Sequence, residues 1–504
     1  MIIHAISYME YEIMKTNMRM IENHFPVLSK VINIMNQHDM FNDIVVLHIN
    51  HFLDDVFILD GIFNNLFFKS VFIAVPYRNA AVPSHYPGTL YHAAFHENGF
   101  ELFCSEQRLV ERVETFSDAM ESMIAHALRH VIAPALTGSR KLLVIEDGGY
   151  HYEPLRRCCA EGLVDPEAIV GVVEQTMSGA IRCADAIRKY GLAYPAFTIA
   201  RSDMKMRYEA FFLGRRVVDE LAYLLYLYDE FLALRRVLII GYGIIGRSMA
   251  LSLNGMACQI TVLDSNDDIA TVARADGHEV LPSHEDLRNF FDTEVVVIGS
   301  TGEASFTLSM LVAFAHGPAP QVFLVSASSK RTEFDAIIQF FEGGTQNRAR
   351  LLASEPRLAA IHDIDIETNP SGLTYTFKYG DRVKRIVLIA RGFPVNFFRK
   401  DGFSLTMGMI DPVNAELALL AGYAVTARQA LQKNRLYALG YSPLPGLSLS
   451  EEEILSIWME KRGITSCRNS PTAWHGFPVH PLEGYLRLRR LSDVQILARE
   501  TECP

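Results

Sequence analysis

The chain has few cysteines, no apolar run long enough to span a bilayer, and fewer basic than acidic residues. Its 504 residues include 7 cysteines, an odd number without CxxC spacing, so neither a disulfide framework nor a zinc or redox motif is predicted. Even a strongly apolar stretch such as residues 56–75 carries Asp60 and Lys69, which are costly in lipid. The first residues lack the basic segment and apolar core of a secretory signal. We therefore expect a cytoplasmic protein with no membrane partner.

The charge balance argues against nucleic acid as a partner. The chain has 47 Lys plus Arg against 58 Asp plus Glu, a net charge of −11, and its densest basic run, residues 487–490, is short. Such a surface offers a phosphate backbone little to bind. The apolar content of 49% is enough for several large cores, and the length predicts about three domains.

The first half of the chain has the pattern of an α/β fold. Apolar runs at residues 44–49 and 71–75 predict buried strands, and residues 118–131 predict an amphipathic helix. Residues 141–149, KLLVIEDGG, predict a buried strand followed at once by an acidic pair, which includes Asp147, and two glycines. Because ligands of open α/β sheets bind at the carboxyl ends of the strands, this turn is a candidate site. A carboxylate that only caps a helix is the alternative.

Residues 235–265 carry a dinucleotide-binding fingerprint. An apolar strand leads to Gly241, Gly243 and Gly246 in GxGxxG spacing, then to a helix and a second strand that ends at Asp264. The glycines permit a tight turn and a close approach of a pyrophosphate to the helix N-terminus. We expect Asp264 to accept hydrogen bonds from the adenosine ribose hydroxyls.

Further residues complete the expected cofactor site. Ile244 and Ile245 fall within the fingerprint, and Ser300 and Thr301 follow the next apolar strand, residues 294–298. The acidic residue at the end of the second strand would repel the 2′-phosphate of NADP, so the pattern favours NAD as cofactor. A glycine-rich turn with a purely structural role is the alternative.

Five blocks of the sequence together resemble the S-adenosyl-L-homocysteine hydrolases. They are residues 145–149 (IEDGG), 171–179 (GVVEQTMSG), 195–214 (PAFTIARSDMKMRYEAFFLG), 236–250 around GYGIIG, and 386–396 (IVLIARGFPVN). The resemblance implies an α/β fold class in which a Rossmann-type NAD domain is inserted into a split α/β substrate domain. It also implies a homo-oligomer, either a dimer or a tetramer.

The resemblance also divides the chain. We expect the first part of the substrate domain at residues 1–215 and the NAD domain at residues 216–375. A return segment of the substrate domain is expected at residues 376–430, followed by a divergent C-terminal tail at residues 431–504.

The family's chemistry is a redox cycle on a nucleoside. NAD takes a hydride from the ribose 3′-carbon, a base removes the 4′-proton, the 5′-substituent leaves, water adds, and the ketone is reduced again. The resemblance places Lys205 at the catalytic lysine, which handles the 3′-hydroxyl proton, and Glu209 at its acidic partner. Asp147 is then a candidate base or orienting carboxylate, and His51 a candidate catalytic histidine. Nothing in this cycle needs a metal ion.

The residues alone leave other interpretations open. A lysine and a glutamate four residues apart are typical of a surface ion pair, and a histidine among apolar residues is often packed in the core. By resemblance, Asp55 lies near the nucleobase edge and Gln175 binds substrate, while Thr176 and Ser178 contact the nicotinamide end of the cofactor.

The sequence departs from the family pattern at several positions. Gln175 stands where the family has a glutamate, and Ala200 and Ala210 stand where it has asparagines. Ser328 lies near the position of one family histidine, and Phe403 lines up with another. Features for NAD and ribose are therefore better retained than features for the amino-acid leaving group.

Three functions are compatible with these observations. The first is an adenosylhomocysteinase-like hydrolase or lyase of one-carbon metabolism that acts on S-adenosylhomocysteine or a related 5′-modified nucleoside. The second is an NAD-binding homologue with a non-catalytic or regulatory role, and the third is an NAD-dependent dehydrogenase of another alcohol. Retention of both Lys205 and Glu209 favours the first.

Overall fold

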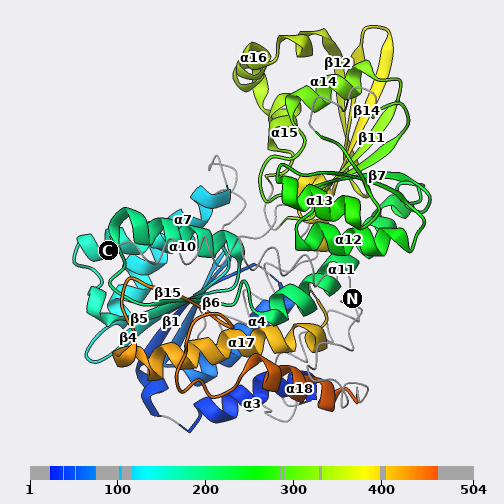
Figure 1. Cartoon of the computed structure of the whole chain (residues 1–504). Helices are drawn as coiled ribbons and strands as arrows, with labels where there is room; N and C mark the ends of the chain where they lie inside the picture. Colours follow the sequence, from blue (N-terminus) through cyan, green and yellow to red (C-terminus); the bar gives the residue numbers. More distant parts are fainter. Residues whose placement is uncertain are drawn as a thin grey trace. The chain divides into compact units, whose positions relative to one another are not determined.

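The computed structural model divides into two compact units, which are described separately. The residues that the structure describes are 23–37, 39–51, 53–74, 101–104, 116–282, 287, 290–328, 332–397 and 405–463. Unit 1 holds those up to residue 209 and from residue 405 onward, and unit 2 holds residues 210–397, drawn in green and yellow in Figure 1. Phe403 and the basic run at 487–490 lie outside the described residues.

Unit 1 is built on a parallel sheet with the strand order β15-β6-β5-β4-β1-β2-β3. The central strands are buried along their whole length, which explains their continuous apolar runs. Strand order reverses between β1 and β4, so their carboxyl ends form the topological switch point at which such sheets bind ligands. The strands are β1 (Ile44–Ile49), β2 (Lys69–Ala74), β3 (Glu101–Cys104), β4 (Lys141–Glu146), β5 (Ile169–Glu174), β6 (Ala196–Thr198) and β15 (Leu436–Ala438).

Helices pack on both faces of this sheet. α17 is buried from Ile410 to Val425, and for this reason its sequence lacks an amphipathic pattern. The α-helices of unit 1 are α3 (Pro26–Met35), α4 (Asp54–Leu66), α7 (Phe116–Ala127), α8 (Ala133–Ala135), α9 (Tyr152–Ala160), α10 (Met177–Tyr190), α17 (Met407–Thr426) and α18 (Glu451–Lys461). Shorter segments are the 3₁₀ turns Asp39–Asp43, Pro166–Ala168 and Arg428–Ala430, and the π-helical segments Leu128–Ile132 and Met204–Glu209.

Unit 2 has the order β12-β13-β14-β11-β10-β7-β8-β9. The run from β9 to β14 is parallel with the Rossmann order, and β13 and β12 extend it as antiparallel strands. Its strands are β7 (Arg236–Ile240), β8 (Gln259–Leu263), β9 (Glu279–Val280), β10 (Val295–Gly299), β11 (Gln321–Ser326), β12 (Ile361–Asn369), β13 (Gly372–Tyr379) and β14 (Arg382–Ile389). Its helices are α11 (Ala210–Leu227), α12 (Ile244–Asn254), α13 (Asp267–Ala275), α14 (Leu308–His316), α15 (Asp335–Glu342) and α16 (Gly344–Ser354), with 3₁₀ turns at Pro356–Ala360, Ala390–Gly392 and Val395–Phe397.

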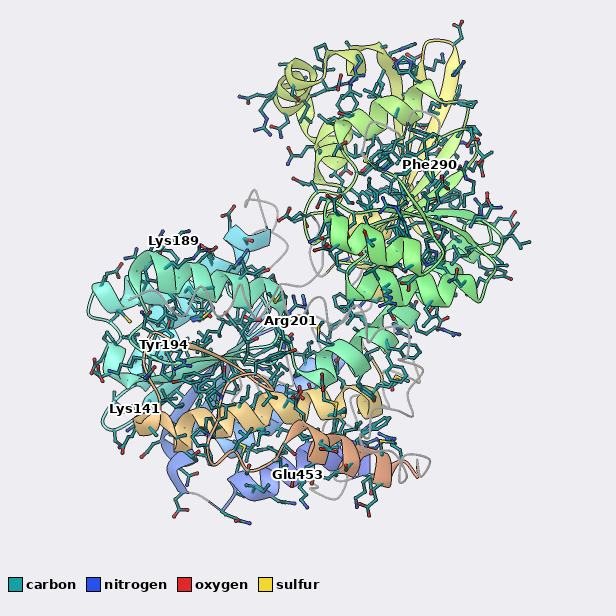
Figure 2. All side chains as sticks on the ribbon, viewed as in Figure 1. Lys141, Lys189, Tyr194, Arg201, Phe290 and Glu453 are labelled. Atoms are coloured by element: carbon teal, nitrogen blue, oxygen red, sulfur yellow. The ribbon has the colours of Figure 1, made fainter. Side chains whose placement is uncertain are left out.

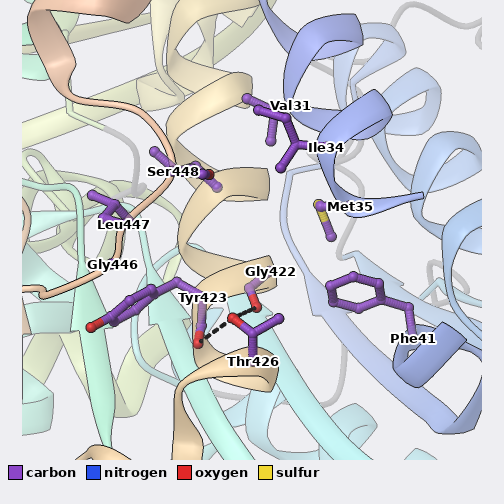
Figure 3. Close-up of a pocket in the computed structure, with 11 residues that line it drawn as sticks. Val31, Ile34, Met35, Phe41, Gly422, Tyr423, Thr426, Gly446, Leu447 and Ser448 are labelled. Atoms are coloured by element: carbon purple, nitrogen blue, oxygen red, sulfur yellow. Dashed lines mark hydrogen bonds between the residues drawn. The ribbon is translucent and has the colours of Figure 1, made fainter. Parts of the chain in front are cut away.

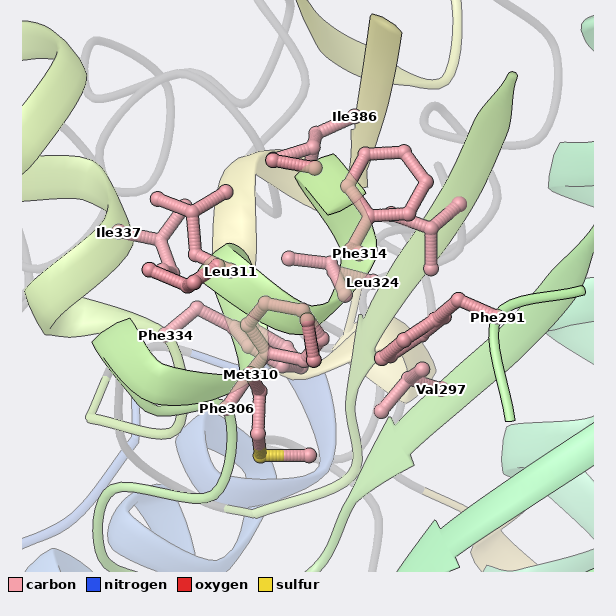
Figure 4. Close-up of a cluster of buried hydrophobic side chains, with 14 of the residues drawn as sticks. Phe291, Val297, Phe306, Met310, Leu311, Phe314, Leu324, Phe334, Ile337 and Ile386 are labelled. Carbon is pink, nitrogen blue, oxygen red and sulfur yellow. The ribbon is translucent and has the colours of Figure 1, made fainter. Parts of the chain in front are cut away.

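The core of unit 2 is rich in phenylalanine. Figure 4 shows Phe291, Phe306 and Phe314 from three segments gathered against Val297 of β10. The Phe291 ring lies edge-on to Phe306 and Phe314, with centroids 6.1 and 5.7 Å away, an arrangement that adds to the gain from burial. Phe290, labelled in Figure 2, is also buried in this cluster. The cluster also contains Leu238 and Ile240 of β7, the strand that leads to the glycine-rich turn.

The predicted fold class, with a Rossmann-type domain inserted into a split α/β domain, is confirmed, and the structure divides the chain at residues that differ from the expected ones. β13 spans the expected end of the inserted domain at residue 375, and β14 pairs with β11 of the same sheet, so this domain continues to residue 397. It begins at Ala210 rather than at residue 216. The expected tail from residue 431 onward contributes β15, which pairs with β6, so its described part belongs to the body of unit 1.

Candidate functional site

The glycine-rich turn of unit 2 lies at the switch point between the carboxyl ends of β7 and β10. Gly241 has a φ of 91°, a left-handed conformation that favours glycine. A Cβ on Gly241 would lie 3.0 Å from the backbone of Ser300, and a Cβ on Gly246 would lie 2.1 Å from the carbonyl oxygen of Gly241. Because the obstacles are backbone atoms, side chains at these positions would force the turn apart.

Helix α12 starts directly from this turn. Gly243 is its N-cap, and Ile244 and Ile245 are its first residues. The first N–H groups of a helix have no acceptor within the helix, so those of Ile244 and Ile245 are available to an anion. Together with the helix dipole they make the turn suitable for a pyrophosphate.

Asp264 directly follows β8. Its carboxylate accepts hydrogen bonds from the backbone N–H groups of Tyr242 at 2.7 Å and Asn266 at 2.9 Å. Each carboxylate oxygen can accept more than one hydrogen bond, so acceptor capacity remains for ribose hydroxyls. Ser300 Oγ donates to the carbonyl oxygen of Gly241 at 2.6 Å and thereby holds the glycine-rich turn.

Thr301 is held by Glu333, a buried residue that the sequence did not single out. Thr301 Oγ1 donates to Glu333 Oε2 at 2.9 Å, and the Gly302 N–H donates to Oε1 at 2.7 Å. Burial raises the pKa of Glu333 above its usual value. A Cβ on Gly299, the last residue of β10, would lie 2.6 Å from Glu333 Oε2. Glu333 therefore anchors the loop after β10, including the predicted cofactor residue Thr301.

The switch point of unit 1 brings three predicted residues together. His51 follows β1, Asp147 follows β4, and His51 Nε2 lies 3.5 Å from Asp147 Oδ2. Gln175 follows β5 and donates from Nε2 to the same Oδ2 at 2.6 Å. The side chains of His51 and Asp147 are 12% and 10% exposed, so both are mostly packed but still reachable. Residues far apart in sequence thus form one polar cluster at the sheet edge.

A buried chain of hydrogen bonds lies beneath this cluster. Asn50 Oδ1 accepts from the N–H of His51 at 2.7 Å and from Gln175 Nε2 at 3.5 Å. Asn50 Nδ2 lies 3.5 Å from His48 Nε2, and His48 Nδ1 lies 3.0 Å from Asp60 Oδ1. In the tautomer with its proton on Nδ1, His48 donates to Asp60 Oδ1 and its Nε2 accepts from Asn50 Nδ2. The chain thereby orients the Asn50 amide toward His51.

Glu174, the last residue of β5, is fully buried next to Glu146 of β4. Its Oε1 accepts from the N–H and the hydroxyl of Thr176, at 2.6 and 2.7 Å, and from the N–H of Gly148 at 3.1 Å. Burial, together with the charges of Glu146 and Asp147, raises its pKa well above the usual range. Glu174 thus links the two turns that carry Asp147 and Thr176.

Thr176 and Ser178 lie at the N-terminus of α10 in unit 1. Thr176 is the N-cap, and its Oγ1 accepts from the N–H of Gly179 at 3.2 Å and lies 3.3 Å from Ser178 Oγ. The structure therefore gives Thr176 a capping role, and the contact of both residues with a nicotinamide stays a prediction. Asp55 is buried in the first turn of α4, and its predicted place near a nucleobase likewise stays a prediction.

Lys205 and Glu209 lie on the π-helical segment that follows β6. Lys205 Nζ and Glu209 Oε2 are 2.5 Å apart, and the two side chains are 14% and 15% exposed. A surface ion pair would be largely exposed to solvent. The low exposure of Lys205 and Glu209 therefore differs from the surface ion pair that their spacing also allowed. π-Helical turns are rare and occur often at functional sites.

A separate cavity of about 260 Å³ lies between α3 and α17 (Figure 3). Its lining is mainly apolar and includes Val31, Met35 and Phe41. Ala424, on the same part of α17, lies beside Gly171 near the start of β5, whereas the polar cluster follows the ends of the strands. The cavity is therefore distinct from the candidate site.

Two absences concern only the part of the chain that the structure describes. No group of three or more His, Cys, Asp or Glu side chains there is arranged to hold a metal ion. Within the same residues, no helix combines the length and the apolar content needed to cross a bilayer.

Comparisons with known proteins give distant relatives. No family model matches the chain. An uncharacterised protein from Mycobacterium tuberculosis is 29% identical over 204 residues, which are 40% of this chain and 35% of the relative. An adenosylhomocysteinase from Gloeothece citriformis is 27% identical over 144 residues, 28% of this chain and 32% of the relative. The chain thus spans about a third of the length of these curated relatives.

Solved structures give only a loose likeness. A 2-hydroxyacid dehydrogenase from Ketogulonicigenium vulgare is 12% identical with a TM-score of 0.32, covering 74% of this chain and 95% of that one. An NAD-dependent formate dehydrogenase from Staphylococcus aureus, solved in complex with NAD, is 11% identical with a TM-score of 0.29, covering 59% and 78%. At these scores the likeness carries no inference about ligand or reaction.

Proposed function

We propose that the chain binds NAD in unit 2 and uses it to oxidise a nucleoside transiently at the 3′-carbon. The proposed substrate is S-adenosylhomocysteine or a related 5′-modified adenosine. The observation that carries the proposal is the Lys205–Glu209 pair, which is withdrawn from solvent at a distance of 2.5 Å on a π-helical turn. A lysine withdrawn from solvent in this way is suited to proton transfer, whereas a lysine that only keeps a protein soluble is exposed on the surface.

The residues of unit 2 fit NAD. Gly241 and Gly246 allow the tight turn from which α12 starts, the N–H groups that begin α12 are free of intrahelical acceptors, and Asp264 has acceptor capacity for ribose hydroxyls. NAD, when bound there, supplies a hydride acceptor that can later return the hydride.

The proton chemistry belongs to unit 1. Lys205 takes the proton of the substrate 3′-hydroxyl as that alcohol is oxidised, and Glu209 stabilises the resulting ammonium. Oxidation acidifies the neighbouring 4′ C–H bond. Asp147, oriented by Gln175 and His51, then takes the 4′-proton while the bond to the 5′-substituent breaks with its electron pair. Water adds to the resulting double bond, and reduction of the ketone regenerates the alcohol.

A non-catalytic NAD-binding role is the second candidate, and specific observations favour it. Asp147 Oδ2 already accepts a 2.6 Å hydrogen bond from Gln175 Nε2. Ala200 and Ala210 are buried methyl groups where the resembling family has asparagines, so neither side chain can bind a substrate hydroxyl.

The test is incubation of the purified full chain with S-adenosylhomocysteine and a panel of 5′-substituted adenosines. We expect NADH absorbance to appear transiently on the protein together with release of the 5′-substituent, and Lys205→Ala to abolish both. Lys189→Ala, at an exposed position on α10 (Figure 2), is the matched control and should behave as wild type. Absence of NAD reduction with every nucleoside would favour the non-catalytic role, and NADH accumulating in solution would indicate a dehydrogenase.

A further inference from the structure

The segment that carries Lys205 is held by two glutamates from the C-terminal part of the chain. Ser202 precedes this segment and is fully buried. The N–H of Lys205 donates to Ser202 Oγ at 3.1 Å, and Ser202 Oγ donates to Oε2 of Glu416 on α17 at 2.6 Å. The Ser202 side chain therefore connects Glu416 to the backbone of Lys205 through two hydrogen bonds.

The environment of Glu416 is unusual for a structural carboxylate. The side chain is completely buried, and its Oε1 has no hydrogen-bond partner among the described residues. Burial raises its pKa well above the usual range, the charges of Glu451 and Glu209 act in the same direction, and Lys205 opposes them. Retaining a buried acid at this position costs stability, which points to a role other than packing.

Glu451, the first residue of α18, holds the same segment from another element. Its Oε1 accepts from the N–H of Asp203 at 2.5 Å. Gly440 makes room for this carboxylate, because a Cβ there would lie 2.4 Å from Glu451 Oε2. The ring of Trp458, further along α18, lies edge-on to that of Tyr208 in the π-helical segment, with centroids 4.9 Å apart. Helix α18 is thus packed against the turn between Lys205 and Glu209.

We propose that Glu416 and Glu451 are positioning residues for Lys205, so that α17 and α18 set the accessibility and the orientation of its amine. This inference rests on the proposed function for its catalytic consequence, but the positioning itself is measurable without turnover.

The positioning is measured by labelling the full chain with acetic anhydride and quantifying each lysine by mass spectrometry. Glu416→Leu removes the acceptor for Ser202, and the loss of that hydrogen bond should raise labelling of Lys205 relative to exposed Lys189 by about fivefold. Glu416→Gln keeps a neutral acceptor of the same shape and should stay within about twofold of wild type. Glu451→Ala should also raise the labelling of Lys205, whereas Glu452→Ala, the exposed neighbour on α18, should not.

Turnover supplies the second measurement. Glu416→Leu should lower kcat by about tenfold with KM changed less than about twofold, because orientation of the amine is lost and substrate contacts are kept. Glu416→Gln should restore kcat. The inference is overturned if Lys205 labelling is unchanged in both Glu416→Leu and Glu451→Ala, or if Glu416→Gln is as impaired as Glu416→Leu. Altered labelling in a protein that reduces no NAD would leave the positioning intact and reject only the proposed function.

Discussion

At the scale of single residues, the tightest constraint in unit 2 lies at Gly246. Its missing Cβ is what lets the first turn of α12 approach the carbonyl oxygen of Gly241, because a Cβ would be only 2.1 Å from that atom. In a dinucleotide-binding turn, this close helix–strand packing places the N-terminus of the helix at the pyrophosphate. This residue therefore links backbone packing to cofactor binding.

Gly246→Ala is expected to weaken NAD binding by at least about tenfold, since the turn must open to admit the methyl group. Gly255→Ala, just after the same helix, is the matched control, because its nearest obstacle is 3.3 Å away and its backbone is helical. Titration calorimetry with NAD measures both. Equal affinities for the two variants would show that the glycine-rich turn does not hold the cofactor.

Asp411 makes the stability of unit 1 depend on pH. Its carboxylate accepts from the N–H groups of Val27 and Leu28 at the start of α3, at 3.1 and 2.9 Å. Burial raises the pKa of Asp411 to about 7, above the value expected in the unfolded chain. The native state therefore binds this proton more tightly, and its contribution to stability is present below pH 4 and lost as the pH rises to about 7.

Asp411→Asn should remove this component. Between pH 4 and 7 the wild-type free energy of unfolding should fall with pH by a contribution of at most about 1.4 kcal/mol per unit, and the fall should flatten in the variant. Denaturant unfolding at several pH values measures the slope. Identical slopes for the two proteins would contradict the assignment.

At the scale of elements, α10 begins at a cap that is also part of the candidate site. Thr176 accepts from the N–H of Gly179 and donates to Glu174, so one side chain joins the helix to the end of β5. Thr176→Ala should destabilise the protein by about 1 kcal/mol, the usual cost of losing an N-cap. Ser178→Ala in the same turn should cost less, because it loses only a 3.3 Å contact. Thermal unfolding compares the two, and equal effects would argue against the capping role.

The strands were predictable because buried parallel strands have continuous apolar runs. Residues 44–49 form β1 as predicted, and Asp264 follows directly after β8. The apolar runs did not indicate which sheet each strand joins. β14 lies in the range expected for the return segment of the substrate domain, residues 376–430, but it pairs with β11 rather than with the sheet of unit 1.

The candidate site was predictable only in part for a related reason. Asp147 and Gln175 directly follow strands in sequence, and this position alone indicates a sheet edge. Glu416 lies within a helix that is buried on nearly all sides, where no periodicity distinguishes it. Its contact with Ser202 joins residues 214 positions apart, which only the tertiary structure reveals.

At the scale of the whole molecule, the chain consists of an α/β unit interrupted by a Rossmann-type unit that continues through β14. A fragment of residues 210–397 should therefore unfold cooperatively, whereas a fragment of residues 210–375 should not. The shorter fragment lacks β14 and the second half of β13, and it exposes the edge of β11 that pairs with β14. Circular dichroism during urea unfolding distinguishes the two fragments. Cooperative unfolding of both would support residue 375 as the end of the inserted domain.

In the proposed reaction, oxidation at the 3′-carbon makes the 4′-proton of a nucleoside exchangeable. The most direct measurement is incubation of the full chain with adenosine in heavy water, followed by mass spectrometry and NMR at the 4′-carbon. We expect the wild-type protein to incorporate deuterium at that carbon and Lys205→Ala to incorporate none. Reduction of NAD by nucleosides without any exchange at the 4′-carbon would contradict the proposed reaction.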